Sequence, residues 1–229
     1  ELQSFSDLIS VTPEPLLIKN LPANDNIILE AMGMSISDEI INGSVIPMEL
    51  VFTSFDGYKR NEVVNIVIGE VRETDPLGPD PYGYYVYDSN DTDYDLTPVY
   101  DWIEIADDLG EQLNLVDYGN GNYSGSYTYS SQVIDLPFIV TFYGVDYTQI
   151  VVNTNGWISF GDFKMYSFRN YPIPGAGGPS PMVAAFWDDL KTGSGGYVHY
   201  YWTNEKVVIQ WDDMRTYDNN DRQTFEIIL

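Results

Sequence analysis

Carboxylates are the most abundant groups in this sequence that could do chemistry, and they are dense in one short segment. Oxygen-bearing side chains recur every one to three positions there: Asp88, Asn90, Asp91, Asp93 and Asp95. Ca²⁺ binds about six to eight oxygens and tolerates the irregular geometry of a loop. The segment lacks the glycine and the final glutamate of an EF-hand, so it is a candidate calcium site of another kind. The alternative is a solvated acidic loop that keeps the protein soluble.

Two further acidic pairs each directly follow a tryptophan. Asp188-Asp189 comes after Trp187, and Asp212-Asp213 comes after Trp211. If the two pairs meet at one edge of the folded chain, they are a weaker candidate for a cation site. The alternative is that they are turn residues at the ends of strands.

The sequence offers no set of residues typical of an enzyme. There is no cysteine, which excludes a thiol nucleophile or thiolate metal site, and one histidine excludes a multi-histidine zinc site. His199 lies between Val198 and Tyr200 in a predicted strand, where a lone histidine is usually a packed or surface residue. A Gly-x-Ser-x-Gly nucleophile turn is absent, and no pair of carboxylates stands out for glycoside hydrolysis. We therefore expect no catalytic residues in this chain, although a longer parent protein could carry a peptidase domain.

The net negative charge indicates which binding partners and which cellular location are expected for this protein. The chain has 35 acidic and 10 basic residues among 229, a formal net charge of −25. Phosphate backbones and anionic membranes would repel it, so we expect neither nucleic-acid binding nor membrane insertion. No apolar run reaches the ~18 residues of a membrane span. The acidity favours a secreted or cell-surface, calcium-rich setting, and the absence of cysteine favours a bacterial protein over a disulfide-stapled eukaryotic one.

Composition and patterning predict an all-β chain in three parts. Aromatic residues make up 15%, with 19 Gly and 13 Pro, which favours strands and turns. Residues 1–71 show short apolar runs between turns and are assigned to an immunoglobulin-like β-sandwich unit that can lack strands. Residues 72–131 are assigned to an acidic linker rich in Pro, Gly and Tyr. Residues 132–229 are densely β, and because the last six residues read as a strand with no turn after it, we suspect a piece of a longer protein.

Five sequence blocks in the C-terminal part carry a family resemblance. They run from Leu136-Pro137-Phe138 to Phe142-Tyr143-Gly144, through 152–160 (VNTNGWISF), 183–189 (VAAFWDD) and 198–201 (VHYY), to 209–214 (IQWDDM) with 224–229 (TFEIIL). In this order the blocks resemble the nidogen-like (NIDO) extracellular module. The resemblance implies a nidogen-like β-sandwich after the immunoglobulin-like one, an association with matrix and cell-surface adhesion, and no catalytic residues.

A second resemblance concerns the assigned linker. Residues 75–85 (DPLGPDPYGYY) and 100–105 (YDWIEI) look like linker modules of large secreted bacterial proteins with gingipain-like or subtilisin-like peptidases. It implies a non-catalytic region of a modular exported protein. Three readings follow: a surface adhesion or interaction module, an accessory domain of a secreted peptidase, and a structural subunit of a surface filament or layer.

The aromatic residues divide into expected core and expected surface. Trp157, Trp187 and Trp211 lie in alternating apolar strands of the nidogen-like blocks, so we expect them in the core. The candidates for a ligand-stacking surface are Trp202, Tyr166 and Tyr171. The expected partners are a surface protein or carbohydrate and neighbouring domains of the same chain.

Overall fold

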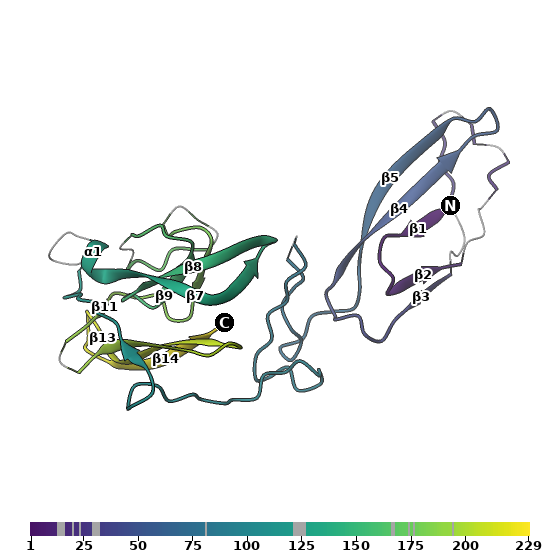
Figure 1. The fold of residues 1–229 in the computed structure, drawn as a ribbon. Coiled ribbons are helices and arrows are strands. Elements are labelled where there is room, and N and C mark those ends of the chain that lie inside the picture. Colours follow the sequence, from purple (N-terminus) through teal and green to yellow (C-terminus); the bar gives the residue numbers. More distant parts are fainter. Residues whose placement is uncertain are drawn as a thin grey trace. The chain divides into compact units, whose positions relative to one another are not determined.

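The computed structural model describes all residues except 13–16, 20, 23, 29–32, 81, 121–126, 166–167, 174, 176 and 194, and of Tyr127 and Thr128 only the backbone. The chain divides into two compact units, Glu1–Asp101 (unit 1) and Trp102–Leu229 (unit 2). Strands are the main regular elements of both units (Figure 1). The prediction of an all-β chain is confirmed. No helix in the described part of the chain is long and apolar enough to span a membrane.

Unit 1 contains two small antiparallel sheets. Strands β4 (Val45–Thr53) and β5 (Lys59–Val67) form a hairpin, and β1 (Leu2–Ser4) pairs with the other side of β4. The second sheet joins β2 (Ile9–Val11) to β3 (Met34–Ile36). The strand and turn assignments at residues 45–68 are thus confirmed. The apolar runs Leu16-Leu17-Ile18 and Ile27-Ile28-Leu29 also predict strands; each run includes a residue outside the described part, and the other residues of both runs form no strand.

The core of unit 1 is thin. Its buried hydrophobic side chains among the described residues are Ile9, Ile41 and Met48. Because a small sheet with few buried side chains gains little from burial, unit 1 depends strongly on polar contacts and on any partner that covers it.

Asp75 ties the residues after the hairpin to unit 1. Its carboxylate accepts hydrogen bonds from the Tyr94 hydroxyl at 2.7 Å, the Arg72 main-chain N–H at 2.7 Å and the Asn42 amide at 3.3 Å. Burial and the bond to Asp75 raise the pKa of Tyr94 to about 12. Residues 72–101, assigned from the sequence to a linker, are therefore part of unit 1, and 102–131 are part of unit 2.

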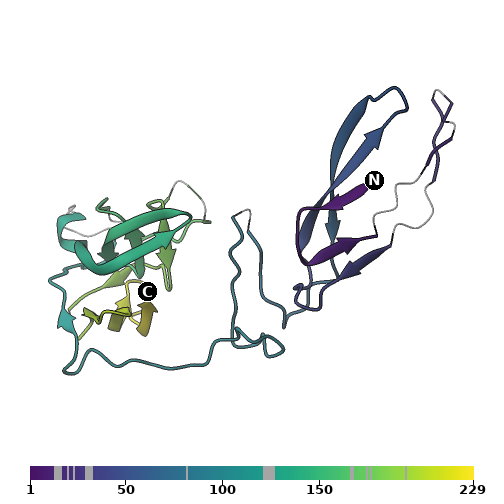
Figure 2. The same cartoon turned by 45° about the vertical axis from the view of Figure 1, so that its right-hand side comes forward.

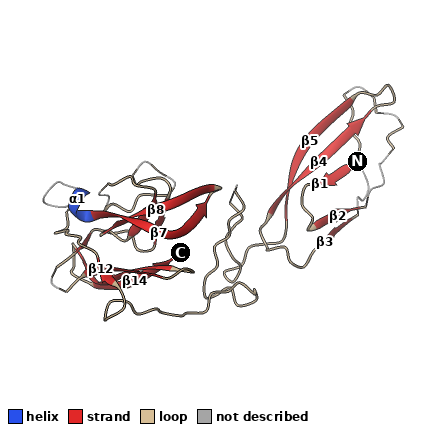
Figure 3. Cartoon of the chain, in the orientation of Figure 1, coloured by secondary structure: helices blue, strands red, loops and turns tan. Residues whose placement is uncertain are grey.

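Unit 2 has two antiparallel sheets in separate layers, which both views show (Figures 1 and 2). The first sheet has the order β10 (Met182–Ala184), β9 (Trp157–Phe160), β8 (Val145–Asn153), β7 (Ser131–Phe142). The second has the order β11 (Leu190–Lys191), β13 (Val207–Thr216), β12 (Tyr197–Trp202), β6 (Glu111–Gln112), and β14 (Arg222–Ile228) also pairs with β13. One short helix is found among the described residues of unit 2: α1 (Tyr127–Ser130), which precedes β7 (Figure 3).

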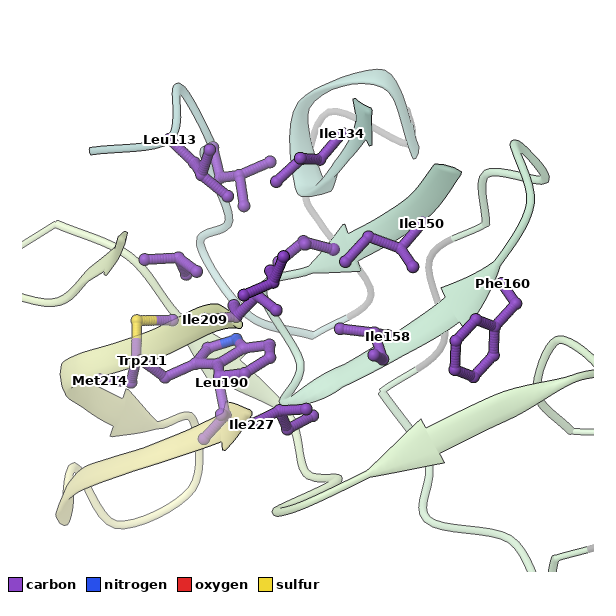
Figure 4. Close-up of a cluster of buried hydrophobic side chains, with 14 residues drawn as sticks. Leu113, Ile134, Ile150, Ile158, Phe160, Leu190, Ile209, Trp211, Met214 and Ile227 are labelled. Atoms are coloured by element: carbon purple, nitrogen blue, oxygen red, sulfur yellow. The ribbon is translucent and has the colours of Figure 1, made fainter. Parts of the chain in front are cut away.

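Alternating apolar residues from both sheets fill the space between them (Figure 4). In the first sheet, Ile150 and Ile158 point inward. In the second sheet, Ile209 and Trp211 point inward, and Met214 joins them because a β-bulge between Trp211 and Met214 shifts the alternation. This two-layer packing is the β-sandwich expected for the C-terminal part.

The outer face of the first sheet is also buried. Val151, Trp157 and Ser159 lie on that face, since their neighbours in the strands point inward, and all three are buried. Met165, which follows β9 in the chain, contacts this face: its carbonyl oxygen accepts hydrogen bonds from Ser131 at 2.6 Å and Asn153 at 2.9 Å.

The outer face of the second sheet is crossed by an extended segment, Trp102–Ala106, which we call the strap. The Gln210 amide oxygen accepts from the Ile105 N–H at 2.9 Å, and the Gln210 amide nitrogen donates to Glu104 at 2.9 Å. The Ile103 N–H donates to Glu226 of β14 at 3.4 Å. The sequence predicts a strand here. The structure shows an extended segment bonded to side chains of the sheet instead of to a neighbouring strand.

Candidate functional site

The tryptophans expected in the core are buried. Trp211 lies between the sheets, where its ring stacks on Phe225 at a centroid distance of 5.0 Å. Trp157 and Trp187 are buried as well, but Trp157 lies on the outer face of the first sheet. These three residues are therefore unavailable for ligand stacking.

Two of the three expected surface aromatics are exposed. Trp202, at the end of β12, is 52% exposed, and Tyr171, in segment 161–181, is 45% exposed. Tyr166 lies outside the described residues. Trp202 and Tyr171 come from different elements, and no contact between their side chains is present in the described structure. Their role in ligand binding stays a prediction.

The acidic segment 88–95 uses part of its carboxylates to shape its own turns. Asp91 is buried, and its carboxylate accepts the Asp88 N–H at 2.6 Å. The Asp88 carboxylate accepts the Asn90 N–H at 2.7 Å, while Asp93 and Asp95 are exposed. Within the described ranges, no three acidic or histidine side chains are gathered closely enough to hold a metal ion. Calcium binding at this segment stays a prediction.

The two acidic pairs lie in different electrostatic environments. Asp189 accepts the Asn120 N–H with both carboxylate oxygens, at 2.9 and 3.0 Å. Burial is the main cause that raises its pKa to about 6; the nearby charges of Asp117, Asp188 and Asp218 also contribute to the rise, and the hydrogen bond from Asn120 opposes it. This carboxyl group therefore changes charge close to neutral pH.

Asp212 and Asp213 interact with another set of residues. Burial and the charge of Glu104 raise the pKa of Asp212, whereas the nearby His199 lowers it. Asp213, at the β-bulge with φ 48°, forms an ion pair with Arg222 of β14. The carboxylates that interact with Asp189 are thus different from those that interact with Asp212.

Asp117 is a buried carboxylate that sequence reasoning missed. It is 1% exposed, and its carboxylate accepts from the Thr154 hydroxyl at 2.8 Å, the Asn155 amide at 3.5 Å and the Gly119 N–H at 2.9 Å. Burial raises its pKa, and these hydrogen bonds oppose the rise. A polar residue directly after the apolar pair Leu115-Val116 is the sequence signal that could have drawn attention to it.

These contacts make the β8–β9 turn a rigid, buried connection. The Asn155 amide oxygen accepts the Leu190 N–H at 2.9 Å, which joins the turn to β11 of the other sheet. Gly156 has φ 79°, and a Cβ there would lie 1.8 Å from the Phe186 carbonyl oxygen. Only glycine fits, which explains the Asn-Gly turn in physical terms. The arrangement stabilises the fold and contains no nucleophile beside a base.

His199 is buried under the strap and does not resemble a catalytic base. Its Nδ1 has no hydrogen-bond partner in the described structure, and its charged neighbours are Asp212 and Glu104. Burial lowers the pKa of His199 despite these two carboxylates, so the neutral form is favoured. The sequence predicts a packed or a surface residue at this position, and the structure shows a packed one.

The most exposed apolar groups of the first sheet lie toward the end of the β7–β8 hairpin. Ile139 and Val145 are exposed, and so is Tyr143, which has φ 49° in the two-residue turn with Gly144. The end of the hairpin pairs Val140–Phe142 with Val145–Tyr147 and has a 2.6 Å hydrogen bond from Thr141 to Asp146, whereas Ile139 lies where the register shifts between Asp135 and Val140. The hairpin therefore presents apolar side chains to solvent.

Comparison with known proteins gives matches to the C-terminal half. Residues 119–229 match the family described as NIDO related. Human alpha-tectorin is 34% identical over 91 residues, and mouse alpha-tectorin is 30% identical over 91 residues. The matched part is 38% of this chain but only 4% of each alpha-tectorin chain. No solved structure matches the chain.

The family match begins after residues 75–105, whose resemblance to peptidase-associated linkers stays a prediction. It contains the Asn-Gly turn, the buried Trp157 and Trp211, and the β7–β8 hairpin described above. The nidogen-like resemblance of the C-terminal blocks is confirmed: residues 119–229 form a NIDO-related domain.

Proposed function

We propose that this chain is a non-catalytic extracellular interaction module, in which the β7–β8 hairpin of the NIDO-related domain contacts a partner protein. The observation that carries the proposal is the group of exposed apolar residues Ile139, Tyr143 and Val145 on that hairpin. Met165 contacts the outer face of the first sheet and the strap contacts that of the second, whereas the three apolar residues of the hairpin are exposed to a partner. Apolar side chains held by a fixed backbone bind with little loss of conformational entropy.

The similarity to alpha-tectorin supports an extracellular location, since the family resemblance implies matrix and surface proteins. Because the matched part is a small fraction of those chains, the partner is proposed from the surface and not from the relatives. More specifically, we propose that the interaction serves adhesion to a matrix or a cell surface. The accessory-domain and filament readings stay alternatives for the parent protein, and so does its bacterial origin.

The test is binding of the full chain to an immobilised basement-membrane extract, measured by biolayer interferometry. We expect the double variant Ile139→Ser, Val145→Ser to weaken binding at least about tenfold, which corresponds to about 1.4 kcal/mol. The matched control is Val99→Ser, which removes an exposed valine from unit 1. Equal binding by both variants would contradict the role of the hairpin, and turnover of general peptidase or glycosidase substrates would contradict the non-catalytic assignment.

A carbohydrate ligand is the second candidate, because Trp202 and Tyr171 are exposed aromatic rings of the kind that stack on sugars. A glycan array probed with the chain and with Trp202→Ala distinguishes the two candidates. Retained glycan binding by the hairpin variant together with loss in Trp202→Ala would favour carbohydrate.

A further inference from the structure

We propose that strand β5 of unit 1 pairs antiparallel with β5 of a second copy of the chain, about a two-fold axis at Val63. The site lies in unit 1, so the proposal is independent of the hairpin function proposed for unit 2. In the described sheet, β5 has β4 on one side and no strand on the other. Nine residues, Lys59–Val67, form this edge.

The hydrogen-bond register shows which backbone groups face the free edge. Ser54 N–H donates to the Tyr58 carbonyl oxygen, and Ile68 N–H donates to the Ser44 carbonyl oxygen. Bonded and non-bonded pairs alternate along an antiparallel hairpin, so the even-numbered residues of β5 bond to β4. Pro47, which has no N–H, lies opposite Asn65 at a non-bonded position, as this alternation requires. The odd-numbered residues, from 59 to 67, therefore direct their N–H and C=O groups to the free edge.

The odd-numbered residues carry the most exposed apolar side chains of the strand, while the even-numbered Val64 is 40% exposed. Val63 is 61% and Val67 is 62% exposed. Natural edge strands usually avoid pairing through prolines, bulges or inward charges. β5 has no proline, and its register with β4 is regular over nine pairs. The residues that direct unpaired backbone groups to the free edge thus include the two most exposed valines of the strand.

Charge and register favour a second copy as the occupant. Most of this acidic chain would repel its own copy, but the β4–β5 hairpin carries Lys59 and Arg60 against Glu49, Asp56 and Glu62, and Arg60 forms an ion pair with Glu62. Pairing about Val63 places valine opposite valine, each Asn61 opposite Asn65 of the other copy, and each Lys59 opposite Val67. No like charges lie directly opposite each other, which is the condition for stable cross-strand pairs.

The absence of cysteine makes a site-specific test available. In the proposed pair, the two Val63 Cα atoms lie about 5.5 Å apart, inside the ~4.4–6.8 Å range of a disulfide. Val63→Cys should therefore give a covalent dimer on mild oxidation, in which the added oxidant removes two electrons and two protons from the two thiols. The matched control is Val45→Cys, an exposed valine in the same hairpin that lies opposite Val67 and away from the axis. We expect at least a tenfold difference in the initial rate of dimer formation.

Sedimentation equilibrium of the full chain, from about 1 µM to 1 mM, tests the pairing without a crosslink. We expect a concentration-dependent dimer that Val63→Pro abolishes, because proline removes an N–H that faces the free edge and not β4. Val63→Thr keeps that N–H and should retain dimerisation within about threefold. A monomer throughout the range, or equal crosslinking of Val63→Cys and Val45→Cys, would overturn the proposal and leave the edge to another occupant.

Discussion

The indole N–H of Trp211 donates a hydrogen bond to the main-chain carbonyl oxygen of Asn153, 2.9 Å away. Trp211 belongs to β13 in one sheet, and Asn153 ends β8 in the other. The bond therefore joins the two layers through the core, next to the buried β8–β9 turn.

Trp211→Phe tests the contribution of this bond. The variant removes the donor and part of the core volume, so we expect a loss of about 2–4 kcal/mol in the free energy of unfolding of unit 2. Urea unfolding followed by tryptophan fluorescence measures the loss. Trp202→Phe makes the same chemical change at an exposed position and should cost no more than about 0.5 kcal/mol. Similar losses in both variants would contradict the role assigned to the inter-sheet bond.

Gly156→Ala tests the close approach at the β8–β9 turn. The new Cβ would overlap the Phe186 carbonyl oxygen, so we expect unfolding to become easier by about 3 kcal/mol or more. Gly161→Ala is the control, because Gly161 also has a positive φ, 94°, but has nothing within 4 Å of its Cβ position. That variant should cost only the backbone strain, about 1 kcal/mol. If both variants lost the same free energy of unfolding, the positive φ and not the contact with Phe186 would account for the loss at Gly156.

The raised pKa of Asp189 predicts that the free energy of unfolding depends on pH. Its pKa of about 6 in the folded chain is above the ordinary value of 3.8, so the folded state binds more protons than the unfolded state between these values. The contribution of Asp189 to stability is therefore largest below about pH 4 and is lost as the pH rises through about 6. Thermal unfolding is measured between pH 4 and 7.5 for the wild type and for Asp189→Asn. We expect the Tm of the wild type minus the Tm of the variant to increase as the pH falls. Asp93→Asn, at an exposed carboxylate, is the control, and a pH-independent difference for Asp189→Asn would refute the assignment.

Calcium binding by segment 88–95 predicts a metal-dependent Tm. At a concentration 100 times the dissociation constant, a bound ion stabilises the folded state by about 2.7 kcal/mol. We expect the Tm in millimolar calcium to fall on addition of a chelator, and the fall to be smaller in the double variant Asp93→Asn, Asp95→Asn. An unchanged Tm would leave the segment as a solvated acidic surface whose buried Asp91 only shapes the turn.

The local patterns predicted the strands of unit 2 well and the polar contacts poorly. The bounds of β9 and β12 agree with the sequence prediction, because both are short, apolar or alternating, and bounded by turn residues. β7 begins at Ser131, earlier than the predicted residue 138, because its first half mixes polar and apolar residues. Asp117 depends on Thr154 and Asn155, which are distant in sequence, so no local pattern could reveal its role.

The strap, at the start of unit 2, is a second case in which a local sequence pattern does not reveal the bonding partners. Trp102–Ile105 has the alternation of a strand, and Ile105 is buried as such a pattern predicts. Its partners are the side chains of Gln210 and Glu226, and a side chain that satisfies a remote N–H leaves no periodic signal in the sequence. The surrounding residues 72–131 are acidic and rich in Pro, Gly and Tyr, and that composition predicts a linker.

The strap also determines how unit 2 would respond to a pulling force. Tension that arrives along the chain from Asp101 acts first on Trp102–Ala106, which is held by isolated side-chain bonds and by the burial of Ile105. The β-strands behind it are held by whole ladders of bonds. Under tension the strap would detach first and lengthen the chain while the sandwich stays folded. The strap would therefore extend at a lower force than the force that unfolds the sandwich.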